Sequence, residues 1–327
     1  MNILYGIQGT GNGHLTRAIE ILPFLQKKAN VDVLISGNQF DLPLPFTPEY
    51  RLKGLDFVFG KNGGINLLET FKRIDSFRFL KEVRNFPVEK YDLVISDFEP
   101  VTCWSSYLRN KKCIGLSNQS ATLHSLAPRP EKIDPLGKLI LEYYAPASIH
   151  YGFHFKSLSD KIFTPIVRKE VRNLQVTDQG HYTVYLPSYN DERIIKQLQK
   201  FNNVKWEIFS KHNKQPVNLK NIAILPVTGK SFLDSMASSS GVLCNAGFGT
   251  ASEALFLGKK LLVVPMKTQY EQQCNAVMLK SMGVSVMKSL KSKHHDVLKY
   301  WILEGKSVTV HYPDQTEKIV DSLLNQL

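Results

Sequence analysis

Residues 245–253, with the sequence NAGFGTASE, combine glycines, a hydroxyl and a carboxylate in an order that suits a phosphorylated ligand. They follow a short apolar run, which predicts a buried strand, and they lead into a predicted helix. The first N–H groups of a helix are unpaired and carry partial positive charge, so this turn is a ready anion site. Gly247 and Gly249 let a ligand approach the backbone without a Cβ in the way. Thr250 and Glu253 lie on one helix face, where phosphate and sugar hydroxyls could bind side by side.

A second polar helix start follows the apolar strand predicted over residues 261–264. Its first turns carry Glu271, Gln272 and Asn275. Both helix starts come after the carboxyl ends of strands, which is where open α/β sheets bind their ligands. The two stretches together predict a nucleotide-sugar pocket.

A second glycine-containing turn follows the first predicted strand. It reads QGTGNGH, contains Gly9, Gly11 and Gly13, and ends at His14. The pattern differs from a dinucleotide fingerprint because the third glycine comes one residue too early. The second strand also ends in ISGN, without the carboxylate that a dinucleotide ribose needs. We therefore expect no NAD or FAD.

These motifs, in this order and with the pairs Val264-Pro265 and Asn275-Ala276, resemble the GT-B glycosyltransferases. The similarity is to the UDP-glycosyltransferases and the bacterial cell-wall N-acetylglucosaminyl transferases, which are glycosyltransferase families 1 and 28. The resemblance implies contacts to the donor by a set of residues in the second half of the chain. The set is Glu253 for the ribose, Gly247, Phe248, Gly249, Thr250 and Asn245 around the diphosphate, Glu271 and Gln272 for the donated sugar, and Ser231 and Phe232 for the nucleobase.

The sequence departs from these families at three of the donor positions. Asn245 stands where plant-type relatives carry a phosphate-binding histidine, and Phe248 replaces a tryptophan. Glu271 replaces an aspartate, whose side chain is one methylene shorter. The identity of the sugar therefore cannot be carried over.

The resemblance also makes His14 the general base and Asp97 its partner. A sugar hydroxyl needs a base because its pKa is far too high for unaided attack, and neutral imidazole can take its proton. A carboxylate would fix the tautomer and stabilise the imidazolium, as in the serine triad. Asp97 ends a predicted central strand, at the same sheet edge as His14. Glu99 is a rival acid or base, and the alternative roles are a helix cap for His14 and a structural carboxylate for Asp97.

We expect no metal and no cofactor beyond the nucleotide-sugar co-substrate, which the resemblance makes UDP-linked. The pair Asp97 and Glu99 is the nearest approach to a D-x-D motif, and no other carboxylates have the spacing that a diphosphate-bridging ion needs. The helix start at 247–250 would then stabilise the leaving diphosphate electrostatically.

The elements that must position these residues alternate between strand and helix along the whole chain. Alternation of this kind predicts α/β architecture with doubly wound parallel sheets. The predicted strands cover 3–7, 31–35, 56–59, 93–96, 113–116, 182–186, 206–209, 222–225, 242–244 and 261–264, and the predicted helices cover 14–28, 67–85, 101–109, 191–200, 230–237, 250–257 and 314–327. We expect two Rossmann-like domains facing a cleft. The expected division is 1–165 for the acceptor side, 166–180 for a linker, 181–310 for the donor side, and 311–327 for a helix that the resemblance places back on the first domain.

Composition restricts the environment and the partners of the protein. The 327 residues carry a net charge of +12, mostly from the second half, which makes an anionic partner plausible. The four cysteines show no metal or redox spacing, and no apolar run reaches the roughly 20 residues that span a bilayer. We expect a cytoplasmic protein. The clearest basic runs lack interleaved aromatics, so we do not expect nucleic acid as the partner.

The acceptor side is less well defined by the sequence. The glycine-rich segment 59–64 is a loop or turn at a strand end, residues 71–84 predict a basic amphipathic helix, and residues 117–120 are expected to line the cleft. Such a helix can bind an anionic membrane surface, although its apolar face more often belongs to the core. We therefore expect a metal-independent, inverting glycosyltransferase with a hydroxyl acceptor, for which a lipid or cell-envelope glycan precursor and peripheral contact with the inner face of a membrane are candidates. The alternatives are a nucleotide-sugar epimerase of related fold and a non-catalytic protein that binds anionic ligands or nucleic acid.

Overall fold

The computed structural model describes residues 1–40, 42–55 and 75–326 of the chain. Seven strands from the described residues of the first half form a parallel sheet in the order β3-β2-β1-β4-β5-β6-β7. Its strands are β1 (Asn2–Gln8), β2 (Asn30–Ser36), β3 (Tyr50–Leu52), β4 (Leu93–Asp97), β5 (Cys113–Ser117), β6 (Ile149–Phe153) and β7 (Ile162–Phe163).

A second sheet lies in the fully described segment 181–286. Its order is β10-β11-β9-β8-β12-β13-β14, and every pairing is parallel except that of β10 with β11. Its strands are β8 (His181–Tyr185), β9 (Lys205–Ser210), β10 (Val217–Leu219), β11 (Ile222–Pro226), β12 (Gly241–Asn245), β13 (Lys260–Val264) and β14 (Ser285–Val286).

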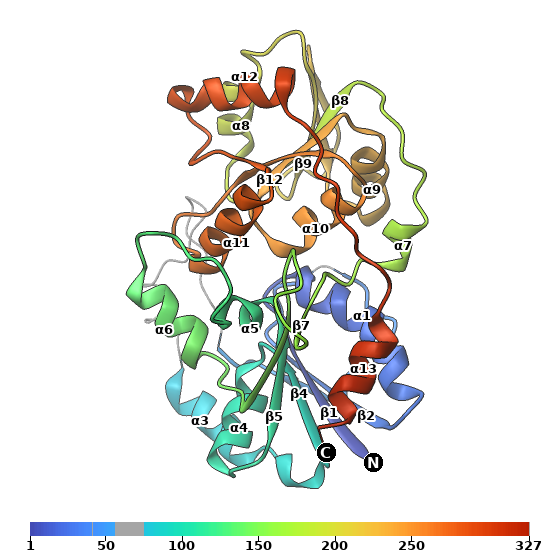
Figure 1. The fold of residues 1–327 in the computed structure, drawn as a ribbon, viewed down its shortest axis with the longest axis vertical. Coiled ribbons are helices and arrows are strands. Elements are labelled where there is room, and N and C mark those ends of the chain that lie inside the picture. Colours follow the sequence, from blue (N-terminus) through green and yellow to red (C-terminus); the bar gives the residue numbers. More distant parts are fainter. Residues whose placement is uncertain (41, 56–74, 327) are drawn as a thin grey trace.

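Helices cover both faces of each sheet (Figure 1). The helices beside the first sheet are α1 (Asn12–Gln26), α3 (Ser76–Asn85), α4 (Pro100–Leu108), α5 (Asn118–Leu123) and α6 (Pro135–Tyr143). Those that follow are α7 (Lys169–Arg172), α8 (Asp191–Leu198), α9 (Gly229–Ser238), α10 (Phe248–Phe256), α11 (Tyr270–Ser281), α12 (His295–Glu304) and α13 (Thr316–Leu324), and short 3-10 turns lie at Val88–Lys90 and Ser292–His294.

Successive side chains of a strand point to opposite faces, so each sheet carries two apolar layers. In β1, Ile3, Tyr5 and Ile7 pack with α1 on one face, whereas Leu4 packs into the cluster on the α3 and α4 face. The continuous burial of β1, β4 and β12 explains why these segments are apolar runs rather than alternating patterns.

The last helix returns to the first sheet. Figure 1 shows the chain descending after α12 to place α13 beside α1. Ile319, Val320 and Leu323 join the core cluster of the first sheet, and Lys28 at the end of α1 pairs with Asp321. This packing ties the end of the chain to its beginning.

The strands and helices predicted within the described residues are present, with shifts of a few residues at their ends. The predicted strand 56–59 and the glycine-rich segment 59–64 lie outside the described residues, and of the predicted helix 67–85 only α3 lies within them. Sequence patterns missed the strands β3, β6, β7, β10 and β14 and the helices α5, α6, α7 and α12. The strands of the first sheet end at Phe163 and those of the second begin at His181, and we propose the domain division 1–165, 166–180, 181–310 and 311–327 on that basis.

Candidate active site

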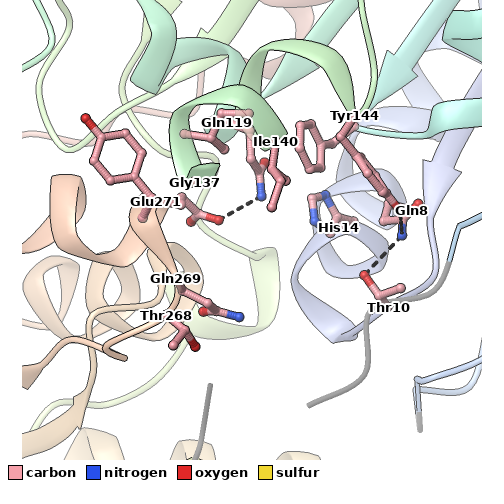
Figure 2. Close-up of a pocket in the computed structure, with 13 residues that line it drawn as sticks. Gln8, Thr10, His14, Gln119, Gly137, Ile140, Tyr144, Thr268, Gln269 and Glu271 are labelled. Carbon is pink, nitrogen blue, oxygen red and sulfur yellow. Dashed lines mark hydrogen bonds between the residues drawn. The ribbon is translucent and has the colours of Figure 1, made fainter. Parts of the chain in front are cut away.

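A pocket of about 160 Å³ lies where the carboxyl edge of the first sheet meets the loop before α11. Figure 2 shows its two sides, with His14 and Tyr144 on one and Thr268, Gln269 and Glu271 on the other. The described residues that line it are Gln8, Thr10, His14, Phe98, Gln119, Gly137, Ile140, Leu141, Tyr144, Thr268, Gln269, Tyr270 and Glu271. Residues far apart in the sequence thus form one pocket with both polar and apolar walls.

His14 and Asp97 form the hydrogen-bonded pair that was expected from the sequence. His14 Nδ1 lies 2.7 Å from Asp97 Oδ1, with the Asp97 side chain fully buried and the His14 side chain 14% exposed. Arg17, one helical turn after His14, donates from Nε to Asp97 Oδ2 at 2.7 Å and from Nη2 to Oδ1 at 2.5 Å. Asp97 is therefore held by two partners on α1.

The charge on Asp97 fixes the tautomer of His14. Burial alone would raise the pKa of Asp97, but the neighbouring Arg17 and His14 outweigh it and lower the pKa below its ordinary value. An ionised Asp97 can only accept hydrogen bonds, so Nδ1 of His14 carries the proton. The lone pair of Nε2 is then the one left to accept a proton from a ligand.

Phe98, which follows Asp97, is in a strained backbone conformation. Its φ of 56° lies in the left-handed region, which is rare for a bulky residue and is found most often at functional sites. The conformation turns the Phe98 ring into the pocket, where it stacks on Tyr144 with ring centroids 4.9 Å apart. Tyr144 in turn accepts a hydrogen bond from Gln8 Nε2 at 2.7 Å, which joins this wall to β1.

Glu99, the other candidate base, caps a helix. Its fully buried carboxylate accepts hydrogen bonds from the backbone N–H groups of Val101 at 2.8 Å and Thr102 at 2.6 Å, and so caps α4. It does not line the pocket. Burial raises the pKa of Glu99, and the hydrogen bonds only partly offset that effect. The geometry therefore favours His14 over Glu99 as the base.

The glycines of the turn between β1 and α1 differ in the space around them and in their backbone conformation. A Cβ on Gly9 would lie 2.6 Å from the Gly37 carbonyl oxygen, and Gly11, the N-cap of α1, has a φ of 150°. A Cβ on Gly13 would meet no atom of residues 1–40, 42–55 and 75–326 within 4 Å. Gly9 and Gly11 are thus required by the fold, whereas Gly13 leaves open space at the start of α1.

Glu271 belongs to the second sheet's side of the pocket but is held from the first. It accepts hydrogen bonds from Asn118 Nδ2 at 2.6 Å, Gln119 Nε2 at 2.9 Å and Asn275 Nδ2 at 3.2 Å. Burial raises the pKa of Glu271, and His14 is the largest influence acting in the opposite direction. The carboxylate thus joins α11 to α5 across the pocket.

The start of α10 has room for an anion. No side chain of the described residues caps it, and a Cβ on Gly247 or Gly249 would meet none of their atoms within 4 Å. Thr250 in its first turn is partly exposed. Unpaired N–H groups with open space in front of them are what a phosphate needs at a helix start.

Glu253, the residue expected to hold the ribose, is engaged by Arg168 from the segment between the two sheets. Arg168 donates from Nε to Glu253 Oε1 at 2.5 Å and from Nη2 to Oε2 at 2.8 Å. The side chains are 19% and 11% exposed, so this is a largely buried bidentate ion pair. A ribose at Glu253 must therefore share or displace Arg168.

Four other expected donor contacts are occupied by protein. Asn245 Nδ2 donates to the Val264 carbonyl oxygen at 2.8 Å, and Gln272 bonds the Met266 N–H and Gln269. Phe248 packs on Phe155 with ring centroids 5.0 Å apart. Phe232 corrects an expectation: it is 8% exposed and packs on Tyr185 and Phe209 in the core, so it is not presented to a nucleobase, whereas its neighbour Ser231 is exposed.

Sequence reasoning missed several residues that complete the site, among them Arg17, Arg168, Phe98 and Tyr144. Arg17 lies three residues after His14, and this helical spacing was a signal that could have been used. Arg168 and Tyr144 gave no signal, because their partners are distant in the sequence. Among the described residues, no group of three or more His, Cys, Asp and Glu side chains could hold a metal ion.

A family model described as glycosyl transferase family 1 matches residues 1–303. None of the curated protein sequences is similar enough to the chain to count as a match.

Solved structures match the chain over its whole length. MurG of Acinetobacter baumannii is 15% identical with a TM-score of 0.57, and the match covers 99% of both chains. Arabidopsis thaliana UGT89C1 complexed with UDP is 13% identical with a TM-score of 0.56, again over 99% of both chains. The spinosyn forosaminyltransferase SpnP is 13% identical with a TM-score of 0.57, over 100% of this chain and 94% of that one. This likeness confirms the expected GT-B fold of two Rossmann-like halves.

Proposed function

The chain belongs to glycosyl transferase family 1, and from this premise we propose that it transfers a sugar from a UDP-linked donor to a hydroxyl acceptor, with inversion and without a metal. The observation that supports the proposal is one pocket lined by both Glu271 and His14, the latter held from behind by the buried Asp97. It brings a base and a sugar-binding carboxylate to the same small volume from opposite halves of the molecule.

The proposed reaction is a single displacement at the anomeric carbon. The acceptor hydroxyl oxygen forms a bond to that carbon as its proton moves to Nε2 of His14, and the bond from carbon to the β-phosphate oxygen breaks. Asp97 stabilises the imidazolium that forms. Because attack and departure occur on opposite faces, the anomeric configuration inverts.

The donor would lie along the carboxyl edge of the second sheet. The uncapped start of α10, with Gly247, Gly249 and Thr250, would receive the diphosphate and stabilise its charge as it leaves. Glu253 would bind the ribose hydroxyls once Arg168 releases an oxygen. Glu271 would bind hydroxyls of the donated sugar, while the engaged side chains of Asn245 and Gln272 would hold the surrounding loops.

We further propose that the acceptor is a lipid or cell-envelope glycan precursor, reached by peripheral contact with the cytoplasmic face of a membrane. The support is a surface beside the pocket. One side of α6 lines the pocket through Gly137, Ile140 and Leu141, while its other side exposes Leu136, Leu139 and Tyr143.

The neighbouring helix α3 exposes a face of mixed character. Phe77 is 83% exposed and Leu80 47%, and Lys81 and Arg84 lie on the same exposed face. Both helices pack on one core cluster through their inner sides. Apolar side chains among cations suit an anionic lipid surface. No helix in the described parts of the chain is long and apolar enough to cross a membrane.

Calorimetric titration tests the donor proposal. UDP, GDP, dTDP and NAD would be titrated into the wild type, Glu253→Ala, and the surface control Glu304→Ala. We expect UDP to bind selectively, with affinity weakened by about 1–3 kcal/mol in Glu253→Ala, the cost of a lost hydrogen bond to a charged group. The control should match the wild type. Binding of none of the nucleotides, or equal binding to Glu253→Ala, would contradict the proposed donor site.

A further inference from the structure

A second pocket, of about 260 Å³, opens at the carboxyl edge of the second sheet. Its walls come from the loop after β8, the loop after β13 and the segment after β14. Three cationic side chains line it, those of Arg193, Lys267 and Lys291, together with the hydroxyl-bearing residues Ser188, Ser289 and Tyr189. No carboxylate lines this pocket.

The three cations are not neutralised within the described part of the chain. None of Arg193, Lys267 and Lys291 forms an ion pair with a described carboxylate. Arg193 instead lies over the ring of Tyr189, with its guanidinium carbon 4.8 Å from the ring centroid. Three unpaired positive charges around one hollow repel each other, and an anion between them would remove that repulsion.

Ser188 gives an independent indication of a ligand. Its side chain is 8% exposed, and its hydroxyl has no hydrogen-bond partner among the described residues. A buried hydroxyl without a partner costs free energy and calls for an explanation such as an absent ion. Ser188 lies on the wall of this cationic pocket, where an anionic oxygen could accept a hydrogen bond from its hydroxyl.

The pocket is distinct from the proposed donor site but is linked to the catalytic pocket. None of the residues expected to bind the donor lines it. One loop separates the two pockets: Lys267 faces the cationic pocket, while Thr268 and Gln269 line the catalytic one. Gln272 fixes this loop by accepting from the Met266 N–H and donating to Gln269.

We propose that the cationic pocket binds a phosphate group of a small molecule that is not the sugar donor. Two or three cations and a hydroxyl donor match a phosphate dianion better than a single carboxylate. Because the pocket shares its loop with the catalytic pocket, its ligand would also fix the position of Thr268 and Gln269.

Titration of inorganic phosphate into the full chain saturated with UDP tests this inference. Saturation with UDP fills the donor site, so any remaining binding reports on another site. We expect saturable binding that weakens about tenfold or more in Arg193→Gln combined with Lys291→Gln, and again in Lys267→Gln alone. The matched control, Lys214→Gln combined with Lys306→Gln, should bind phosphate as the wild type does.

Three results would overturn the inference. These are no saturable binding of phosphate in the wild type, unchanged binding in the charge-removing variants, and binding that disappears when UDP is present. The last would assign the pocket to the donor diphosphate. UDP affinity, measured on the same variants, should stay at the wild-type value and shows that they remain folded.

Discussion

At the residue scale, the site depends on the Asp97 carboxylate, which holds both the proposed base, His14, and the cation Arg17. Asp97 accepts from His14 and from Arg17, and the latter is itself buried. Arg17 keeps Asp97 ionised, and an ionised Asp97 keeps the proton of His14 on Nδ1. We therefore regard Arg17 as a positioning residue for the base.

Because Asp97 is ionised in the folded state, the free energy of unfolding should depend on pH in the acid range. The pKa of Asp97 is lowered in the folded state, so its stabilising effect is present above its ordinary pKa of 3.8 and is lost as the pH falls below that value. Asp97→Asn leaves Arg17 buried without a countercharge and should cost about 3–5 kcal/mol at pH 7. The measurement is the free energy of urea unfolding between pH 7 and pH 3.

The difference in free energy of unfolding between the wild type and Asp97→Asn should become smaller below about pH 4. Other buried carboxylates, such as Glu99, titrate in both proteins and cancel in the difference. The exposed Asp92→Asn is the control and should follow the wild type. If the difference in free energy of unfolding between the two proteins stays constant down to pH 3, Arg17 and His14 do not lower the pKa of Asp97.

Single residues were predictable where local spacing carried the information. The family resemblance paired His14 with Asp97, and the sequence placed both residues after the carboxyl ends of predicted strands, at one edge of the sheet. Arg168 could not be predicted to hold Glu253, because the two are 85 residues apart and an ion pair gives no periodic pattern. The burial of Phe232 likewise depends on aromatic partners from other strands.

At the element scale, the turn between β1 and α1 is set by close packing on one side and open space on the other. Gly9 N–H donates to the Ser36 carbonyl oxygen at 2.6 Å, which draws the turn against the end of β2. Gly13 faces open space. The same glycine-rich turn therefore serves both the fold and the site.

This difference predicts opposite results for two alanine substitutions. Gly9→Ala forces its Cβ against backbone oxygens and should lower the free energy of unfolding by about 1–3 kcal/mol. Gly13→Ala should leave stability unchanged or slightly higher, because alanine favours the helix. Thermal unfolding of both variants checks this. Equal destabilisation would mean that the turn is not packed as described.

The segment between the sheets contacts α10 through Arg168, and this contact predicts an unusual response to ligand. Arg168→Gln leaves the Glu253 carboxylate largely buried without its cation, so the variant should unfold at a lower temperature. UDP would then supply ribose hydroxyls to a carboxylate that has no other partner. The rise in unfolding temperature on adding UDP should be larger in Arg168→Gln than in the wild type.

The control is Arg172→Gln, one turn away in α7, whose side chain bonds a backbone carbonyl rather than Glu253. It should show the wild-type response to UDP. A smaller response in Arg168→Gln than in the wild type would mean that Arg168 itself binds the donor.

Elements with strong apolar runs were predictable, and short peripheral ones were not. The central strands β1, β4 and β12 are buried on both faces and so gave clear signals. The strand β7 has two residues and α5 has six, too few for a pattern. Yet α5 supplies two of the three side-chain amides that hold Glu271, so the missed helix matters for the site.

At the scale of the whole molecule, the pocket is formed only where the two halves meet. Glu271 from α11 meets Asn118 and Gln119 from α5, and Phe248 packs into the core clusters of both sheets. After α12 the chain crosses from the second half back to the first, where α13 packs beside α1. The overall arrangement was predictable from the alternation of elements and the family resemblance, whereas the contacts across the junction required the structure.

The exposed apolar surface of α6 predicts binding to anionic membranes. Vesicles that contain phosphatidylglycerol should sediment the wild type, and purely zwitterionic vesicles should sediment it less. Leu139→Ser combined with Tyr143→Ser should weaken this binding about tenfold, because two large apolar contacts are lost. The matched control is Tyr300→Ser combined with Leu303→Ser on α12, which are equally exposed. Equal loss in both pairs would refute a specific surface on α6.

The central claim is that His14 is the base in a glycosyl-transfer pocket, and the most direct measurement pairs turnover with donor affinity in His14→Ala. UDP release would be followed with UDP-glucose, UDP-N-acetylglucosamine and UDP-galactose, with water as acceptor, and UDP affinity would be measured on the same protein. The exposed His212→Ala is the control. We predict that turnover with the best donor falls by about 10²–10⁴-fold in His14→Ala while UDP affinity stays near the wild-type value. Unchanged turnover, or an equal loss of turnover and affinity, would contradict the account.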